Sequence, residues 1–496
     1  MAIVVSIYYS LPHRFRWLLL LAASYYFYIS WEPGYAVLLL VSTIIDFTAG
    51  LLMGKASKKS RRKVIFLAGI IFNVGLLFIF KYYNFFADSL KSLTAHFNIF
   101  FPIPHLNLLL PIGISYYTFK KIGYLIEVYR QNQEPEKHFG RFALYVSFFP
   151  GIVAGPIDRA KKLLPQFAKR IDFDYQQVTD GLKLMAWGFF KKLVIADRLA
   201  VYVNQVFNHL GRYEGVPLIL AVYCFSFQVY CDFSGYTDIA IGAGKIMGFR
   251  MMENFDRPYL ARSVPDFWKR WHISLTSWLM EYLFLPIAYA VSGKIKSARL
   301  LHIKAETWSY FIGVICTMLL CGIWHGAAWT FVFWGLLHGV YLLLSYITKK
   351  TRKGIRKSLK IRKNSILHKC FGIFITFNLV SFSWIFFRAK TFSHAEYVIK
   401  HLFTGVPEFI AQTVSTGLSP LRLVLEKMGI TPGDFIIVVI ALGILFLAEL
   451  LSRDGVIFSL FSKKPVWLRW SIYYLIVFYI YFFGKFTATE FLYARF

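Results

Sequence analysis

The residue whose type and position best suit chemistry is His325, in the stretch Cys-Gly-Ile-Trp-His-Gly-Ala-Ala-Trp at 321–329. It lies within 308–347, 40 residues that contain no Asp, Glu, Lys or Arg. An imidazole with an ordinary pKa of about 6.5 suits general-base work, such as taking the proton of a hydroxyl that attacks an activated acyl group. A titratable group at membrane depth is a functional-site hypothesis by default. The alternative is a neutral imidazole hydrogen-bonded to a helix neighbour, and this stretch alone favours neither.

A second group of polar residues lies in 253–287, a segment that starts polar and ends apolar. Its amphipathic pattern predicts an interfacial or half-buried helix, with tryptophans at the membrane boundary or at the mouth of a cavity. His272 lies in this segment, but an isolated Trp-Lys-Arg-Trp-His motif would be a surface feature more often than a site. The segment also contains Asn254, Arg270, Trp271 and Glu281.

Two carboxylates, Asp232 and Asp238, interrupt the apolar segment 216–247. At 100° per residue Asp238 and Lys245 share a helix face, so an ion pair between them is plausible. We interpret both aspartates as supporting structure that fixes helix packing, with a direct role in substrate binding as the alternative. For His338, which lies about 220° around a continuous helix from His325, we favour a packing role.

Metal and cofactor chemistry have little support in the sequence. A metal site needs three or more ligands, and His272 and His325 are not part of a close pair such as His-x-x-x-His. The chain has no GxSxG, HExxH, P-loop or dinucleotide-binding fingerprint. Its five cysteines are an odd number without a CxxC pair, which is typical of small core residues. We therefore expect no metal and no bound cofactor.

The elements that must position these residues are membrane helices. Of 496 residues 57% are hydrophobic and 19% aromatic, which predicts an all-α polytopic membrane protein with one integral domain over 1–496. The uncharged run 308–347 is long enough for two crossings of a ~30 Å hydrocarbon core. Short segments broken by Pro or Gly, 108–119 and 147–157, are interpreted as re-entrant pieces around a central pocket. Roughly ten to thirteen crossings are expected from the apolar segments 15–30, 35–54, 64–80, 106–119, 142–155, 182–200, 216–247, 279–292, 308–348, 370–387, 434–451 and 467–484.

The net charge of +30 indicates membrane orientation and not nucleic-acid binding. The segment 55–63 holds six basic residues, and 349–363 holds nine basic residues and no acid. The positive-inside rule places both in the cytoplasm beside anionic headgroups. The basic runs lack the interleaved aromatics of a nucleic-acid site.

Several separate motifs resemble the membrane-bound O-acyltransferase (MBOAT) family. They are Ser-Gly-Tyr-Thr-Asp-Ile-Ala-Ile-Gly at 234–242, the segment 253–279 with its Trp-Lys-Arg-Trp-His core, and Gly-Ile-Trp-His-Gly-Ala-Ala-Trp at 322–329. The likeness extends through 24–33, 111–119, 154–159 and 383–389 and covers most of the chain. It is nearest to the branch of alginate O-acetylation, peptidoglycan O-acetylation and teichoic-acid D-alanylation.

The resemblance implies a ring of helices around a central funnel, with the family's essential histidine at His325 and a second one at His272. On this reading His272, supported by Arg270, is the second candidate catalytic residue and orients the donor or stabilises the oxyanion. The candidates for lining a tunnel or binding substrate are then Trp324, Trp271, Arg270, Glu281 and Asn254.

The resemblance further implies a cytoplasmic thioester donor, acetyl-CoA or an acyl carrier protein, and transfer of a short acyl group to an extracytoplasmic polysaccharide. A partner resembling SGNH hydrolases would complete the transfer, and the location would be the bacterial cytoplasmic (inner) membrane. The tail 490–496, Glu-Phe-Leu-Tyr-Ala-Arg-Phe, is similar to an acyl-handover motif in which Tyr493 accepts the acyl group.

The sequence departs from the family pattern in three places. The first family helix is largely missing before residue 13, a Gly-rich turn is replaced after 283–287, and Glu281 stands where Asp is commoner. Because of these departures, the resemblance defines the binding site of the acyl donor least well. Alternative functions are an enzyme of the same fold that acylates a lipid or a protein, a non-catalytic transporter or flippase, and a scaffold with a degenerate site.

Overall fold

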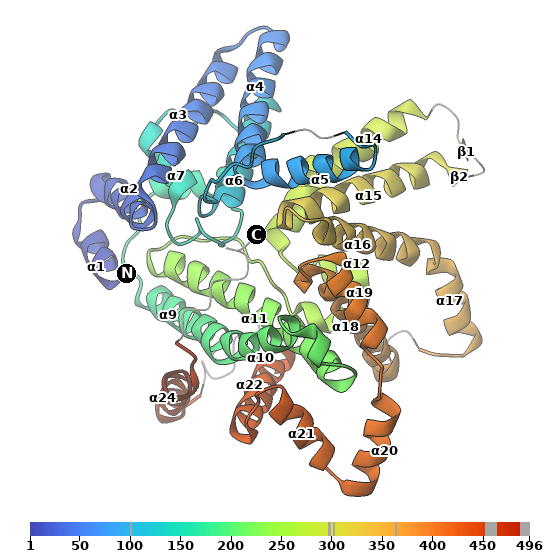
Figure 1. Cartoon of the computed structure of the whole chain (residues 1–496). Helices are drawn as coiled ribbons and strands as arrows, with labels where there is room; N and C mark the ends of the chain where they lie inside the picture. Colours follow the sequence, from blue (N-terminus) through green and yellow to red (C-terminus); the bar gives the residue numbers. More distant parts are fainter. Residues whose placement is uncertain (100–101, 296–298, 301–302, 363–364, 452–463, 487–496) are drawn as a thin grey trace. The chain divides into compact units, whose positions relative to one another are not determined.

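The computed structural model describes residues 1–99, 102–295, 299–300, 303–362, 365–451 and 464–486. The chain forms two compact units: unit 1 comprises 1–185 and 239–253, and unit 2 comprises 186–238 and 254–496. Helices dominate both units (Figure 1). The expected all-α polytopic class is therefore confirmed.

Unit 1 begins with a short helix and continues through two longer ones. Its helices are α1 (Ala2–Ser10), α2 (His13–Ile29), α3 (Pro33–Lys55), α4 (Lys59–Leu77), η1 (Phe78–Tyr82), α5 (Tyr83–Ala95), α6 (Ile114–Tyr129), α7 (Phe139–Ser147), α8 (Ala160–Ala168) and most of α9 (Tyr175–Phe189).

Unit 2 takes the chain from the end of α9 onward, and α11 runs from unit 2 into unit 1 after Asp238. The elements from α9 to the two-residue strands are η2 (Phe190–Ala196), α10 (Asp197–Phe207), η3 (Leu210–Arg212), α11 (Val216–Ile246), η4 (Pro258–Leu260), α12 (Val264–Trp268), α13 (Ile273–Leu279), η5 (Met280–Phe284), α14 (Leu285–Lys294), and the antiparallel β1 (Arg299–Leu300) and β2 (Ile303–Lys304). The later helices are α15 (Ala305–His325), α16 (Trp329–Ile347), α17 (Lys349–Ser358), α18 (Ile366–Arg388), α19 (Phe392–His401), α20 (Val406–Thr416), α21 (Ser419–Lys427), α22 (Pro432–Leu451) and α24 (Val466–Phe483).

Nine helical segments of the described chain are long and apolar enough to cross a membrane, fewer than the ten to thirteen expected. Four expected segments account for most of the difference. α2 has 17 residues, 106–119 is largely irregular before α6, α7 has nine residues, and 182–200 carries buried charges. The nine are Pro33–Lys55, Lys59–Ala95, Val216–Ile246, Ile273–Lys294, Ala305–His325, Trp329–Ile347, Ile366–Arg388, Pro432–Leu451 and Val466–Phe483.

Buried polar side chains join three helices of unit 1. Lys121 on α6 lies 3.0 Å from Asp46 on α3, between Nζ and Oδ2, and neither side chain is exposed. Asn73 on α4 donates from Nδ2 to the other oxygen, Oδ1 of Asp46, at 2.7 Å. A buried charge is tolerated when it is paired and hydrogen-bonded, so this triad fixes the mutual positions of α3, α4 and α6.

The two segments predicted to be re-entrant contact each other within unit 1. The first, 108–119, is irregular as far as Gly113 and then continues into α6, and the second, 147–157, lies almost entirely in the irregular connection between α7 and α8. Gly113 adopts a left-handed conformation with φ 69°, and a Cβ there would lie 2.1 Å from the carbonyl oxygen of Ile152. Only glycine permits this approach. The irregular backbone of these segments is thus packed against protein, whereas their re-entrant course and the central pocket stay predictions.

In unit 2, Arg198 on α10 holds the ends of two other helices. Its Nη1 pairs with Asp434 in the first turn of α22, and its Nη2 donates to the carbonyl oxygen of Phe483 at the end of α24, at 2.6 Å. The backbone N–H of Lys485 donates to the carbonyl oxygen of Leu193 in the π-helix η2 at 2.9 Å. The last described residues of the chain are therefore attached to the segment η2–α10.

Candidate active site

The position of His325 is fixed by the hairpin of α15 and α16, which run side by side (Figure 1). α15 ends at His325, and α16 begins after the turn 326–328. The helices approach closely at glycines: a Cβ at Gly322 would lie 2.3 Å from the carbonyl oxygen of Phe331, and one at Gly335 would lie 2.2 Å from a carbonyl oxygen of α15. The uncharged run is therefore two helices, and His325 lies at the end of one of them.

Aromatic rings enclose the imidazole of His325, which is 2% exposed. Ring centroids lie 4.9 Å away for Trp324, 5.0 Å for Trp334 on α16 and 5.3 Å for Phe387 on α18. All three contacts are edge-to-face, the arrangement that aromatic rings prefer. Three helices therefore build a wall that excludes water, and hydrogen bonds inside such a wall are stronger than in solvent.

His272 is held in an unusual backbone conformation. It precedes α13 with φ 44° and ψ 54°, the left-handed region that few residues other than glycine adopt. Asn254 keeps it there from 18 residues away in the sequence. The backbone oxygen of Asn254 accepts from the N–H of Ile273 at 2.8 Å, and its Oδ1 accepts from the N–H of Ser274 at 3.2 Å.

Trp324 brings the two candidate histidines together. The ring of His272 is fully buried, with its centroid 4.7 Å from that of Phe233 on α11 and 5.8 Å from that of Trp324. Since Trp324 also contacts His325, one indole touches both imidazoles. Sequence reasoning named Trp324 only as a wall residue and did not anticipate this shared contact.

Burial determines the charge of His272. The residue precedes the membrane-spanning segment Ile273–Lys294, and burial lowers the pKa of its imidazole to about 3. The ring is therefore neutral near pH 7, with one nitrogen that donates and one that accepts a hydrogen bond. A neutral imidazole can orient a substrate or stabilise an oxyanion without changing its own charge.

Arg270 is engaged by carboxylates of its own segment. Its Nε donates to Oδ1 of Asp266 at 2.9 Å, and its Nη1 donates to the backbone oxygen of Asp256 at 3.3 Å. Nη1 also lies 3.6 Å from Oδ2 of Asp256. These contacts join the two ends of the segment 256–270, which contains η4 and α12. The contacts just given run to this segment and not to His272, so the predicted support of His272 by Arg270 stays a prediction.

Two further residues predicted to line a tunnel lie apart in unit 2. Trp271 is fully buried, with ring centroids 5.4 Å from Phe267 and 5.2 Å from Trp384. Glu281 lies on η5 and is exposed. Trp271 therefore has the surroundings of a core residue, and the substrate-binding roles of both residues stay predictions.

Asp232 and Asp238 are both paired, but not as expected. Asp238 lies 2.7 Å from Nζ of Lys191, and Asp232 lies 2.6 Å from Nζ of Lys192. The predicted pair of Asp238 and Lys245 is wrong, because Lys245 lies 3.4 Å from Asp180 instead.

Close packing of α11 on the end of α9 explains these pairs. A Cβ on Gly235 would lie 2.8 Å from the carbonyl oxygen of Gly188. This approach brings the two consecutive lysines, Lys191 and Lys192, to carboxylates on α11. Sequence reasoning missed both lysines, although two consecutive cations in the middle of the apolar segment 182–200 were the signal that could have revealed them.

His338 has the contacts of a packing residue, as expected. Trp268 donates from Nε1 to its Nδ1 at 3.3 Å, and its Nε2 lies 2.9 Å from the hydroxyl oxygen of Ser383. The ring is fully buried. Both of its nitrogens are therefore used in joining α12, α16 and α18.

Two remaining expectations concern metals and the tail. Throughout the part of the chain that the structure describes, no group of three or more His, Cys, Asp or Glu side chains is placed to hold a metal ion. Tyr493 lies outside the described residues.

Comparison with known proteins places this geometry in a family. Residues 137–387, half of the chain and including both histidines, match the profile of the membrane-bound O-acyltransferase family. A probable alginate O-acetylase, AlgI, of Azotobacter vinelandii is 36% identical over 387 residues, which are 78% of this chain and 72% of the relative. The chain belongs to the membrane-bound O-acyltransferase family.

Other relatives within this family carry related names. A peptidoglycan O-acetyltransferase of Helicobacter pylori is 33% identical over 77% of this chain and 72% of the relative. A teichoic acid D-alanyltransferase of Bacillus subtilis is 28% identical over 68% of this chain and 81% of the relative. As an MBOAT protein the chain is an acyltransferase with multiple membrane helices, so the transporter and scaffold alternatives are dropped.

Proposed function

We propose that this acyltransferase moves a short acyl group, an acetyl group, from a cytoplasmic thioester donor across the membrane for O-acylation of an extracytoplasmic polysaccharide. Two relatives at 36% and 33% identity are named for O-acetylation of alginate and of peptidoglycan, both carbohydrate polymers. The third is named for transfer of D-alanine, another small acyl group. These names support a short acyl donor and an envelope polymer as the acceptor.

In the proposed mechanism His325 is the general base. The acceptor oxygen forms a bond to the thioester carbonyl carbon, the carbon–sulfur bond breaks, and the hydroxyl proton passes through His325 to the leaving thiolate. His272 orients the donor or stabilises the developing oxyanion. The observation that carries this proposal is the contact of both imidazoles with Trp324, because it brings a base and a second polar ring to one buried place.

The direction of transfer follows from charge. The basic segments 55–63 and 349–363 indicate the cytoplasmic side, where acetyl-CoA or an acyl carrier protein would supply the thioester. We assign the protein to the bacterial cytoplasmic membrane. On the outer side, Tyr493 is proposed to receive the acyl group and pass it to an extracytoplasmic partner that resembles SGNH hydrolases.

Substitution of His325 tests the proposal. Full-length protein is assayed in membrane vesicles of its own cells, which retain envelope polymers and partner proteins, with labelled acetyl-CoA or acetylated carrier protein, and label in polysaccharide, lipid and protein is counted separately. His325→Ala and His325→Gln should lose about 10²–10⁴-fold in transfer, the usual contribution of a general base. His209→Ala is the control, because His209 is an exposed histidine of the same unit.

The outcomes separate the parts of the proposal. Full transfer by His325→Ala would remove His325 as the base. Label in lipid or in a protein other than this chain and its partner, without label in polysaccharide, would replace the polysaccharide acceptor. Mass spectrometry of the C-terminal peptide tests Tyr493 independently: acylated peptide from the parent protein and none from Tyr493→Phe is expected. Transfer by Tyr493→Phe at the parent rate would exclude the relay while leaving His325 untouched.

A further inference from the structure

Helix α17 carries a concentration of positive charge that has no role in the proposed acyl transfer. It lies in the connection 349–363 between α16 and α18, in which nine of fifteen residues are basic and none is acidic. No salt bridge to any of these cations is found among the residues that the structure describes, and most of their side chains are exposed. Among the described residues, ion pairs therefore do not neutralise this charge.

The cations and the apolar residues of α17 occupy different faces. At 100° per residue Lys350, Lys353 and Lys357 fall on one side of the helix. Ile355 and Leu359, one turn apart, fall on the other side and are 54% and 64% exposed. A basic face opposite an exposed apolar face is the pattern of a helix that lies in the plane of a membrane interface.

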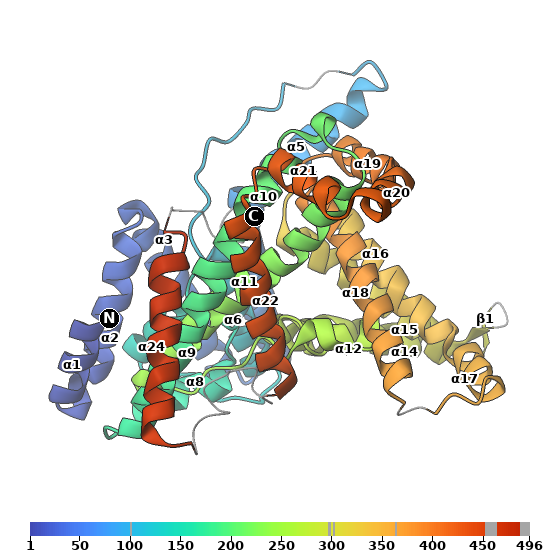
Figure 2. The same ribbon diagram turned by 90° about the horizontal axis from the view of Figure 1, so that it is seen from below.

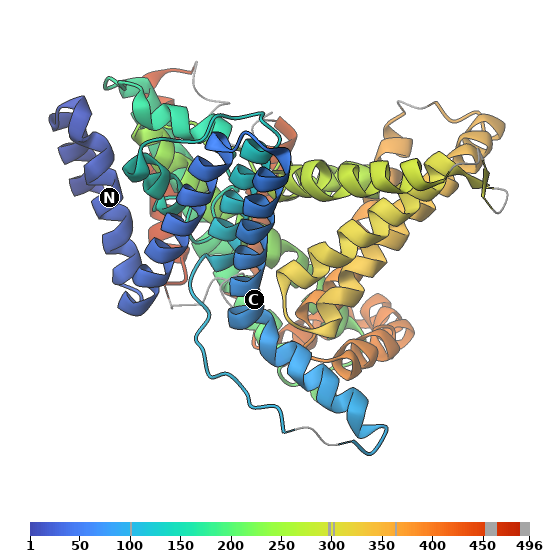
Figure 3. The same ribbon diagram turned by 90° about the horizontal axis from the view of Figure 1, so that it is seen from above.

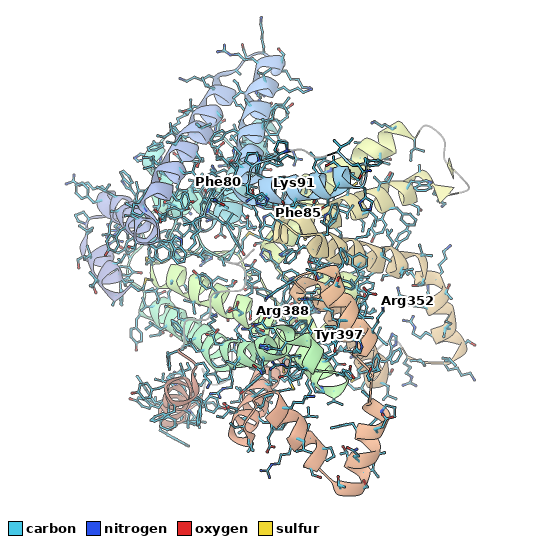
Figure 4. All side chains as sticks on the ribbon, viewed as in Figure 1. Phe80, Phe85, Lys91, Arg352, Arg388 and Tyr397 are labelled. Carbon is cyan, nitrogen blue, oxygen red and sulfur yellow. The ribbon has the colours of Figure 1, made fainter. Side chains whose placement is uncertain are left out.

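One basic residue of α17 contacts the preceding helix α16 and is not part of the lysine face. Arg352, labelled in Figure 4, donates from Nη2 to the backbone oxygen of Ser345 at 2.6 Å and from Nε to the hydroxyl of Thr348 at 3.1 Å. A guanidinium at the carbonyl end of a helix is favourable, so Arg352 caps α16. α17 consequently begins directly at the end of a membrane-spanning helix.

Charge also distinguishes the two ends of unit 2. Figures 2 and 3 show α17 at one end of this unit and α20–α21 at the other. The connection 389–431, which contains α20 and α21, has four basic and three acidic residues and is nearly balanced. The positive-inside rule therefore assigns the end with α17 to the cytoplasm.

We propose that α17 is a binding site for the anionic phospholipid headgroups of the cytoplasmic leaflet. Lys350, Lys353 and Lys357 contact the phosphates, while Ile355 and Leu359 enter the boundary with the acyl chains. Lipid is favoured over an acidic protein because membrane-spanning helices on both sides keep α17 at the bilayer surface, where its apolar face finds hydrocarbon. This inference is independent of the proposed function.

Hydrogen exchange of the full-length protein tests this site. The protein is reconstituted in nanodiscs of phosphatidylcholine alone or mixed with phosphatidylglycerol, and exchange of the backbone amides of 349–358 is followed by mass spectrometry. Phosphatidylglycerol should slow this exchange, and high salt should remove much of the effect. Lys350→Gln, Lys353→Gln and Lys357→Gln together should reduce the lipid-dependent protection by about 10²-fold.

A matched control removes the same charge elsewhere. The triple variant changes three exposed residues of the other basic segment, 55–63: Lys58→Gln, Arg61→Gln and Lys63→Gln. It should leave the protection of α17 unchanged. Equal protection in both lipid mixtures would overturn the proposal. So would protection that appears only when an acidic acyl carrier protein is added, because α17 would then be a protein-docking site.

Discussion

At the scale of single residues, Asn254 supports the site through the backbone. Its Oδ1 is the acceptor for the N–H of buried Ser274, in the first turn of the helix that His272 precedes. Asn254→Ala should leave that N–H without this partner, which typically costs about 1–3 kcal/mol in the free energy of unfolding. We expect a lower thermal midpoint in detergent, together with reduced acyl transfer because the turn at His272 loosens.

Asn254→Asp separates this role from substrate binding. Aspartate retains the oxygen that accepts from Ser274, so it should recover most of the thermal midpoint lost in Asn254→Ala. If both variants unfold at the parent temperature, the bond to Ser274 does not hold the turn.

The buried imidazole of His272 makes stability depend on pH. Unfolded chains bind a proton on histidine below about pH 6.5, whereas the lowered pKa of about 3 keeps folded His272 neutral. The stabilising contribution is therefore lost as the pH falls from 6.5 toward 3. Replacement with asparagine, which tolerates the left-handed conformation, removes this titration.

Thermal unfolding of the parent and of His272→Asn is compared across this acid range. The difference in unfolding free energy between them should change by about 1.4 kcal/mol per pH unit, the value for one proton. A difference that stays constant with pH would mean that the pKa of His272 is not lowered in the folded protein.

The sequence indicated the two histidines, but residue spacing did not reveal what holds them. His325 was selected because an imidazole in an uncharged run suits general-base chemistry, and His272 was selected through the family resemblance. Asn254 was selected as a tunnel residue, whereas its side chain is engaged by the backbone of a segment 20 residues away. Such a bond forms only when an irregular segment folds back onto a helix, and the spacing of residues in the sequence does not indicate it.

At the scale of elements, the pair of Lys191 and Asp238 attaches α11 to η2. Their side chains are 5% and 19% exposed, and the ion pair is 2.7 Å long. Asp238→Leu should leave the ammonium of Lys191 largely buried without its partner, at a cost of about 3 kcal/mol in stability. Lys191→Met combined with Asp238→Leu should recover much of this loss, and thermal unfolding of the three variants measures the coupling.

Lys245→Met is the matched control, because Lys245 was the partner expected from the sequence. Its side chain is 39% exposed and its pair with Asp180 is long, so its loss should cost at most about 1 kcal/mol. A larger loss for Lys245→Met than for Lys191→Met would restore the original assignment.

Helix positions were more predictable than helix partners. Apolar length identified α3, α15, α16, α18 and α22 within a few residues, because a bilayer requires such lengths. The partner of Asp238 was assigned within its own helix, since only one helix is visible in a sequence. The true partner became available because Gly188 and Gly235 let two helices meet, and that approach is a tertiary property.

At the scale of the whole molecule, charge distribution gives the chain a direction. α3 and α4 are joined by only three residues, 56–58, within the basic segment 55–63, and α16 and α18 are joined through basic α17. In contrast, α18 and α22 are joined through the nearly neutral 389–431. Basic connections remain in the cytoplasm, so the first two connections should be inside and the third outside. The proposed transfer requires this direction.

Accessibility of single cysteines in intact cells tests the orientation. The exposed native Cys370 is first replaced by serine, and Ser57→Cys, Ser358→Cys and Ser415→Cys are made one at a time at exposed positions. A membrane-impermeant thiol reagent should modify the cysteine at 415 in intact cells, and those at 57 and 358 only after the membrane is opened. The opposite pattern would place α17 and the other basic segment outside. A cytoplasmic thioester donor would then meet the face of the protein opposite to the basic segments.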